Sequence, residues 1–384
     1  MAVTGRVRLT YGNLAGKVAF VICLAGGGGC GGATTVSEKT GVSVVPPEDD
    51  ARTAQLLESV RNNDLVAVKG ILKGGIDIDS PGEGGKTALM VAATLGNIEM
   101  LQFLLDNGAL PDSTQKDGAT ALMLAAGMGD RRAVVLLHEK GAGINRKTRD
   151  GMTALMFAAL KGDEETVRYL LENGAAPNTK ETSGETPLIV AAAEGHETVV
   201  SQLLAHGADV NGIAKNGWSP LMYAAARGSL PVIGTLITAG ARLDITGEKG
   251  MDVLMAAARE GHADAVRALL DAGADPSRRK RGGWTALMLA AGAGHFEVVQ
   301  ALVTGGAEVD AVNRSNWSAL MLAAGKGYEN IVSLLLSSGA APDRKDLFGL
   351  SATDIARENG HTAILELLEA SGTSPNQSKD PVAK

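Results

Sequence analysis

The chain has 384 residues, 45% of them hydrophobic and only 3% aromatic, so it can bury a long core of aliphatic side chains rather than rings. Its formal net charge of −7 argues against a general affinity for nucleic acid. The only two cysteines, Cys23 and Cys30, lie near the start, which excludes a disulfide framework for everything that follows them.

Residues 1–30 have the layout of a bacterial export signal. Arg6, Arg8 and Lys17 precede the apolar run 18–25, and no acidic residue comes before that run. The run is too short to span a bilayer comfortably as a permanent helix. We therefore predict that this segment directs export.

Four glycines and then Cys30 follow the apolar run. This order resembles the processing site of a bacterial lipoprotein, where a cysteine after small residues is acylated and becomes the mature N-terminus. It departs from that site at Gly27, where lipoproteins carry leucine or a similar residue. We expect lipidation of Cys30 and a location in the bacterial cell envelope, periplasmic or lipid-anchored. Cleaved export without a lipid, an uncleaved anchor and a cytoplasmic protein are the alternatives.

Residues 31–50 show no helical period and end in two prolines and three acidic residues. We predict a flexible tether, whose root-mean-square span would be roughly 25 Å for about 20 residues. The repeats described next occupy residues 51–372, and the polar segment 373–384 is expected to be a disordered tail.

One pattern returns every 33 residues through the middle of the chain. It reads TALMLAA from Thr285, and the corresponding segments begin at Thr87, Thr120, Thr153, Thr186, Ser219, Asp252, Ser318 and Ser351. A fixed period in this range indicates stacked supersecondary units. All nine first positions are Thr, Ser or Asp, whose side chains accept hydrogen bonds from the free N–H groups at a helix start. We predict an N-cap at each of them.

A glycine follows nine residues after each cap and predicts the end of the first helix, because glycine readily adopts the left-handed conformation. These glycines are Gly96, Gly129, Gly162, Gly195, Gly228, Gly261, Gly294, Gly327 and Gly360. A second helix, with apolar residues at helical spacing, then runs to a second glycine. A polar connector leads to the next cap.

Helix, tight turn, helix and extended connector at this period resemble the ankyrin repeat, most closely in GETPLIVAAAEGHETVVSQLLAHGADVN at residues 184–211. The resemblance implies an all-α solenoid of about ten stacked copies, two of them caps, with connectors that form β-turn or hairpin fingers. One departure is systematic, because the fourth position of the TPLH-type segment usually holds histidine. Here it holds Met90, Met123, Met156, Ile189, Met222, Met255, Met288 and Met321. We expect apolar packing to replace the polar bonds of that histidine.

The first and last copies differ from the others. The first has Ala54 at the N-cap position and Asn63 at the glycine position, and the last has Asp354 and Arg357 where other copies are apolar or small. Polar residues at these places would shield the ends of the stack, so we predict that both copies are caps.

Two repeated patterns resemble metal sites. Histidines follow the turn glycine in four copies, and a methionine recurs once per copy (His196, His262, His295, His361 and the methionines above). Helices of neighbouring copies lie about 8–10 Å apart, which is too far for two imidazoles to share one zinc ion. The same separation argues against copper binding by the methionines, so we expect turn-and-cap histidines and core methionines.

The remaining motifs are weaker. The segment that begins at Asp77 lacks the carboxylate a calcium loop needs at its twelfth position, which is Ala88. The run Gly26–Gly29 follows no strand and so does not predict a phosphate-binding loop. No Ser/His/Asp or Cys/His set stands outside a capping or turn position. We predict no catalytic residue, cofactor or metal, and no enzymatic activity.

The resemblance implies that fingers and first helices line a concave face that binds other proteins. All three tryptophans, Trp218, Trp284 and Trp317, directly precede an N-cap. A residue there can pack against its own helix as a hydrophobic staple. Because tryptophan is also enriched at binding hot spots, a docking strip for a partner is the other interpretation.

Charge distinguishes the connectors from the rest of the chain. The six residues from seven to two before each of the nine caps carry a summed charge of +8, in a chain of −7. The peak is Arg278, Arg279, Lys280 and Arg281. A solvated basic loop is one interpretation, and steering of an acidic partner is the other. Nucleic-acid binding is disfavoured because the cluster is short and isolated.

We therefore predict a monomeric, non-enzymatic protein–protein interaction scaffold that is exported and tethered to a membrane only through its lipid. It would bind a partner protein, acidic in the steering interpretation, and no specific nucleic acid. The predicted contact residues are Trp218, Trp284, Trp317, Arg278, Arg279, Lys280 and Arg281. The alternatives are a cytoplasmic ankyrin-repeat regulator or effector and an accessory subunit that stabilises an enzyme.

Overall fold

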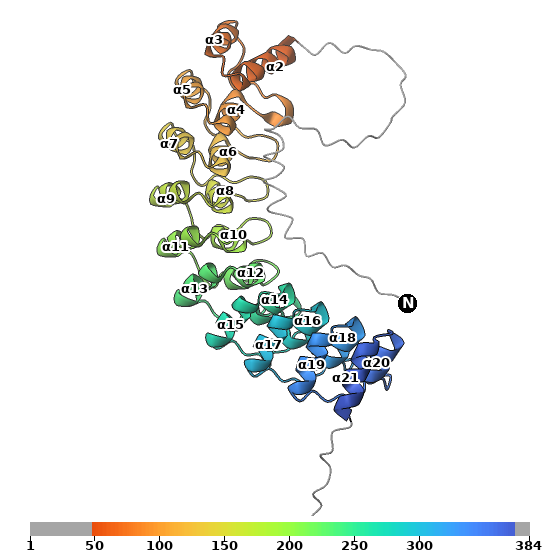
Figure 1. The fold of residues 1–384 in the computed structure, drawn as a ribbon. Helices are drawn as coiled ribbons and strands as arrows, with labels where there is room; N and C mark the ends of the chain where they lie inside the picture. The colour runs from red at the N-terminus through yellow and green to blue at the C-terminus, as the bar shows by residue number, and fades with distance from the viewer. Residues whose placement is uncertain (1–47, 373–384) are drawn as a thin grey trace, which may run out of the picture. The chain divides into compact units, whose positions relative to one another are not determined.

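The computed structural model describes residues 48–372, which form 20 α-helices and contain no named strand. The predicted export signal with Cys30, nearly all of the predicted tether and the tail 373–384 lie outside the described residues. The first helix already begins at Glu48, so it includes the last three residues of that tether. Each repeat contributes two helices (Figure 1).

The first helices of successive repeats are α2 (Glu48–Arg61), α4 (Ala88–Leu95), α6 (Ala121–Met128), α8 (Ala154–Lys161), α10 (Pro187–Glu194), α12 (Pro220–Arg227), α14 (Val253–Glu260), α16 (Ala286–Ala293), α18 (Ala319–Lys326) and α20 (Ala352–Glu358). The second helices are α3 (Leu65–Lys73), α5 (Ile98–Asp106), α7 (Arg131–Glu139), α9 (Glu164–Glu172), α11 (Glu197–Ala205), α13 (Leu230–Thr238), α15 (Ala263–Asp271), α17 (Phe296–Thr304), α19 (Glu329–Ser337) and α21 (Thr362–Gly372). Two connectors contain a 3₁₀ turn, η1 (Glu83–Gly85) and η2 (Glu248–Gly250).

The predicted N-caps are confirmed in all nine repeats. Each cap side chain accepts a hydrogen bond from the backbone N–H three residues later, at 2.8–3.4 Å. A cap of this kind stabilises a helix by about 1 kcal/mol. Eight first helices end at the predicted glycine in the left-handed conformation, from Gly96 to Gly327. Helix α20 ends one residue earlier, at Asn359, although Gly360 is still left-handed.

The core lies along the first helices. Helix α8 shows the pattern, because all six residues from Ala154 to Ala159 are buried, whereas its partner α9 buries mainly one side through Val167 and Leu170. The eight predicted positions, seven methionines and Ile189, are all 0–1% exposed. Apolar packing therefore replaces the polar bonds of the histidine that the family usually carries.

The described helices fall into two compact units, which divide between Ala176 and Pro177. In the first unit α4 packs on α6 and α6 on α8, while the second helices α5, α7 and α9 form a parallel layer (Figure 1). In the second unit α10, α12, α14, α16, α18 and α20 stack in turn, each next to its second helix. Each unit is thus a stack in which a repeat contacts only its neighbours.

The terminal repeats have polar replacements at the predicted positions. Asn63 adopts a left-handed φ of 54° in place of the usual glycine. In the last repeat Ser351 and Asp354 form a capping box, and Arg357 lies within 3.3 Å of Asp354 and 3.8 Å of Glu369. These ion pairs occupy the outer end of the stack, as expected of a cap.

We call each connector between a second helix and the next first helix a finger. Backbone N–H groups near the finger tips donate to the preceding finger, as from Lys116 to Gly84 at 2.9 Å and from Lys215 to Ser183 at 2.8 Å. Side-chain oxygens at the finger bases accept from the next repeat, as Asn178 does from the N–H of Asp209 at 2.8 Å. These bonds recur along each unit and fix each finger to its neighbours.

Candidate protein-binding face

Trp218 lies in the interior of the finger layer, with only 8% of its surface exposed. Its ring meets Tyr223 edge to face, with centroids 5.2 Å apart, and Tyr223 is the fourth residue of the helix that Ser219 caps. This is the geometry of a hydrophobic staple. The next finger covers the ring, since a side chain at Gly247 would come within 2.5 Å of it. The burial does not support Trp218 as a contact residue, and the staple interpretation accounts for it.

Trp317 is half-buried and joins two fingers. Its Nε1–H donates to a carboxylate oxygen of Asp346 at 3.1 Å. The other carboxylate oxygen of this buried Asp346 accepts from the N–H groups of Phe348 and Leu350, at 2.8 and 3.0 Å. The indole thus positions the last finger.

Trp284 is the tryptophan that accompanies the basic loop. It is half-buried, and its carbonyl accepts from the N–H of Lys280 across the finger turn at 2.9 Å. The Lys280 ammonium lies 5.7 Å from the centroid of the indole, within the range of a cation–π interaction. Because Trp218 is buried, the three rings do not form one continuous exposed strip.

The four residues of the basic loop, Arg278 to Arg281, form two pairs that differ in their contacts. Arg278 donates to the carbonyl of Asp244 in the preceding repeat at 2.8 Å. Arg279 donates to the carbonyl of Val312 and to Glu308 in the next repeat, both at 2.8 Å. These two arginines connect neighbouring repeats, whereas Lys280 and Arg281 have no ion pair among the residues the structure describes.

Arg259 was not among the predicted contact residues, although its charge acts on Lys280. Burial lowers the pKa of Lys280, and repulsion from Arg259 and Lys249 lowers it further. Arg259 could have been found as an exception to the repeat, since the internal copies carry Thr94, Gly127, Leu160, Ala193, Ala226, Gly292 and Gly325 at its position.

Two of the four histidines that follow the turn glycines, His262 and His295, lie within hydrogen-bond distance of the preceding repeat. A ring nitrogen of His262 lies 2.9 Å from the carbonyl of Ala226, and one of His295 lies 3.1 Å from the carbonyl of Arg259. Because a carbonyl only accepts, the Nε2 atom of each ring carries a proton. Within residues 48–372 no group of three or more His, Cys, Asp or Glu side chains could hold a metal ion. The structural assignment of these histidines is consistent with this geometry.

An apolar tip on the last finger was also missed. Leu347 and Phe348 are 69% and 85% exposed. The equivalent positions in the other fingers hold only polar residues or glycine. In the sequence, only this break in the repeat pattern could have pointed to Leu347 and Phe348, because neither residue lies in a helix or next to an N-cap.

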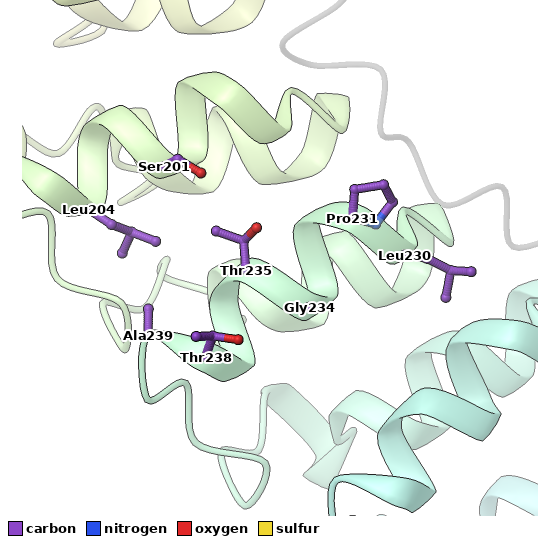
Figure 2. A pocket seen from close by; sticks show the side chains of 8 residues that line it. All are labelled: Ser201, Leu204, Leu230, Pro231, Gly234, Thr235, Thr238 and Ala239. Carbon is purple, nitrogen blue, oxygen red and sulfur yellow. The ribbon is translucent and has the colours of Figure 1, made fainter.

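A shallow hollow of about 530 Å³ lies on the second helices α11 and α13 (Figure 2). Leu204, Leu230 and Pro231 supply most of its apolar lining, and its polar groups are the hydroxyls of Ser201, Thr235 and Thr238. None of the eight lining residues is charged, so the hollow offers a ligand little orientation. In the described part of the chain no helix is both long and apolar enough to cross a membrane.

Stacked helix pairs joined by hydrogen-bonded fingers define a solenoid of repeats. A family model described as ankyrin repeats in three copies matches residues 45–115, 89–181, 155–247, 221–313, 254–346 and 305–379. The chain therefore belongs to the ankyrin-repeat family.

The chain is similar over short stretches to several curated proteins. It is 39% identical over 61 residues to the inactive serine/threonine-protein kinase TEX14 of Mus musculus, a match that covers 16% of this chain and 4% of the kinase. It is 37% identical over 65 residues to ankyrin repeat, SAM and basic leucine zipper domain-containing protein 1 of Rhinolophus ferrumequinum, covering 17% and 13%. It is 41% identical over 51 residues to myotrophin of Xenopus tropicalis, covering 13% and 43%. Each match therefore spans less than half of the relative.

Among solved structures, the human ASB11 ankyrin repeat domain superposes with a TM-score of 0.54 at 25% identity, over 59% of this chain and all of that domain. Ankyrin repeats are typically non-enzymatic interaction domains, and they indicate a protein–protein interaction scaffold.

Proposed function

We propose that this scaffold, acting as a monomer, binds an acidic partner protein on the finger and first-helix face of the unit that begins at Pro177. The observation that carries the proposal is a row of exposed cations. Five successive fingers of this unit carry Lys215, Lys249, Arg281, Arg314 and Lys345, all exposed.

The fixed spacing of these fingers supports the proposal. Backbone bonds connect them, including Arg281 to Lys249 at 2.6 Å and Arg314 to Gly282 at 2.8 Å. Cations held on a rigid row produce a local positive field although the chain as a whole is negative. Such a field speeds the encounter with an acidic partner and selects its orientation.

The exposed pair Leu347 and Phe348 supplies apolar surface at the end of the same row. A large exposed aromatic side chain next to cations is a favourable anchor for a partner with a matching pocket. We infer that charge steers the partner and that Phe348 contributes to retaining it.

The test is recovery of the partner with the tagged full chain, followed by binding measurements on variants. In Arg281→Glu/Arg314→Glu the charge of the finger row is reversed at two exposed sites, and we expect at least about a tenfold loss of affinity. The matched control is Arg131→Glu/Arg132→Glu on the second helix α7, which makes the same change of charge away from the fingers. Equal losses in both pairs, or no loss in the finger pair, would show that the face is wrongly assigned.

We also propose that the chain is exported and anchored in the bacterial cell envelope through a lipid on Cys30. The layout of residues 1–30 supports this proposal. Intact mass of the membrane fraction should give a chain that begins at Cys30 with a diacylglyceryl group, and Cys30→Ser should leave that fraction. A membrane-fraction mass that includes residues 1–29 would rule out the lipid on Cys30 and support an uncleaved anchor, and recovery of the chain from the cytoplasm would support the cytoplasmic alternative.

A further inference from the structure

One group of three cations on the proposed face has a single paired acid, Glu260. We define Lys249, Arg259 and Lys280 as the cation cluster. We propose that the cation cluster binds the side-chain carboxylate of a glutamate or aspartate in an extended acidic segment of the partner protein. This inference rests on the proposed function, because it identifies the chemistry by which the finger and first-helix face recognises its partner.

Arg259 projects from the end of α14, where it contacts Trp218 of the preceding repeat. Its guanidinium carbon lies 6.0 Å from the centroid of that indole. Its Nε donates to Glu260 at 2.9 Å. Its Nη2 atom is shielded from water and has no hydrogen-bond partner among the described residues. An unused buried donor on a permanently charged group is costly. The 25% of the Arg259 side chain that stays exposed is the part that a carboxylate can approach.

Lys280 belongs to the next finger and lies over Trp284. Its ammonium has no carboxylate within ion-pair distance in the described part of the chain. The positive charges of Arg259 and Lys249 act on it, and together with burial they lower its pKa. Three cations with only Glu260 as a paired acid form a site whose excess positive charge an incoming carboxylate would reduce.

The backbone of Lys249 is strained. It adopts a left-handed φ of 62° inside η2. Two other fingers also have two successive left-handed residues before the cap, and they carry Gly84 and Gly282 at the position of Lys249. A lysine there has a conformational cost that glycine avoids. An unfavourable backbone and mutual repulsion at the same place are typical of a site whose residues are arranged for a ligand.

A carboxylate suits this arrangement better than a bulky polyanion. Arg259 and Lys280 are both only partly exposed, and each cation already lies against an indole ring, which leaves room for a small anion rather than a large one. The chain's net charge of −7 opposes long polyanions, whereas a short acidic segment needs only this local field.

The probe is hexaglutamate labelled with fluorescein, and its binding to the full chain is followed by fluorescence anisotropy at physiological salt. Labelled hexaglutamine is the uncharged control. We expect saturable binding of hexaglutamate only, and at least about a tenfold weaker affinity in Arg259→Gln and in Lys280→Gln. The matched control is Arg267→Gln on α15 of the same repeat, which removes one exposed charge; its affinity should stay within about twofold.

Thermal melts establish that the variants are folded. Lys280→Gln should melt no lower than the unchanged chain, because it removes a repelled cation. Hexaglutamate binding unchanged in Arg259→Gln and Lys280→Gln would overturn the proposal. So would equal weakening in Arg267→Gln, or full displacement of the peptide by inorganic phosphate at equal concentration.

The two proposals can fail separately. The finger pair Arg281→Glu/Arg314→Glu could lose the recovered partner while Arg259→Gln binds hexaglutamate normally. That result would support the assigned face and contradict the carboxylate site at the cation cluster. If Arg259→Gln loses hexaglutamate binding while the finger pair keeps the partner, the result supports the carboxylate site and contradicts the assigned face.

Discussion

Asp252 shows how one residue departs from a repeat at an energetic cost. It is the only aspartate among the nine N-caps and is 2% exposed. Burial raises its pKa above the ordinary 3.8, although bonds from the N–H groups of Met255 and Leu254 and the charge of Arg278 oppose the change. A carboxylate at a helix start is normally favourable, but here its desolvation is the larger effect.

We predict that Asp252→Thr, which restores the cap used elsewhere, raises the melting temperature at pH 7 by about 2 °C. The raised pKa means that the folded chain binds the proton more tightly than the unfolded chain. Stability from this group is therefore present at low pH and is lost as pH rises above 3.8 through the folded value. The advantage of the threonine should shrink toward pH 4, and Ser318→Thr should change little. A variant that melts lower at pH 7 would contradict this account.

The pKa shift of Lys280 makes stability change with pH in the opposite direction to that of Asp252. Its pKa is lowered by burial and then by Arg259 and Lys249, so between the folded value and the ordinary 10.5 the unfolded chain binds more protons. Stability therefore rises with pH across that interval. We predict that Lys280→Met melts higher than the unchanged chain at pH 7 and that the difference narrows by pH 10. Arg281→Met, at an exposed site, is the control, and a constant difference across pH would refute the linkage.

At the scale of the helix, the buried methionine row carries the stack. Met156 is 0% exposed within α8. Met156→Ala should reduce the free energy of unfolding by about 2–5 kcal/mol, because it removes packed atoms and leaves a cavity. Met156→Leu conserves volume and should cost less than about 1.5 kcal/mol. Urea unfolding measures both, and similar losses for the two variants would mean that shape, rather than burial, determines the cost.

The fingers depend on side-chain clamps as much as on backbone bonds. Asn178 accepts from the N–H of Asp209 at 2.8 Å and donates to the carbonyl of Gly207 at 2.9 Å. We predict that Asn178→Ala costs about 1–2 kcal/mol, since two exposed hydrogen bonds are lost. Asn178→Asp should cost about half as much, because it keeps the acceptor, as Asp79, Asp112 and Asp310 do in other repeats. Equal costs in urea unfolding would show that the donated bond contributes nothing.

Helices and their ends could be predicted from the sequence because their causes are local. A cap such as Thr153 and a glycine such as Gly162 act within one helix, so their spacing is sufficient. The contacts of the candidate site are not local. Arg259 meets Trp218 from the preceding repeat, 41 positions earlier. The repeat pattern correctly placed Trp218 directly before its N-cap. It did not predict that the next finger would cover the indole ring.

At the scale of the whole chain, a regular period predicts repeats that contact their neighbours, but it does not predict how the repeats group into compact units. The division between Ala176 and Pro177 falls within a finger. Proline occupies the same register at Pro111, Pro276 and Pro342, so no composition change marks the boundary.

Because each repeat contacts only its neighbours, the position of a defect should decide how far it spreads. Ile364 in the last helix, α21, and Leu269 in the interior helix α15 are both 0% exposed. Truncation of either to alanine removes about 2–5 kcal/mol. In Ile364→Ala we expect faster amide hydrogen exchange only in α20 and α21, since the terminal repeat can open without disturbing the others.

In Leu269→Ala the damaged repeat has neighbours on both sides. Opening it breaks two interfaces, so exchange should accelerate from α12 through α17 while α20 changes less. Exchange measured peptide by peptide with mass spectrometry separates the two patterns. Uniform acceleration throughout the second unit in both variants would mean that this unit unfolds as one cooperative block. The energies of its repeats could not then be assigned to nearest neighbours.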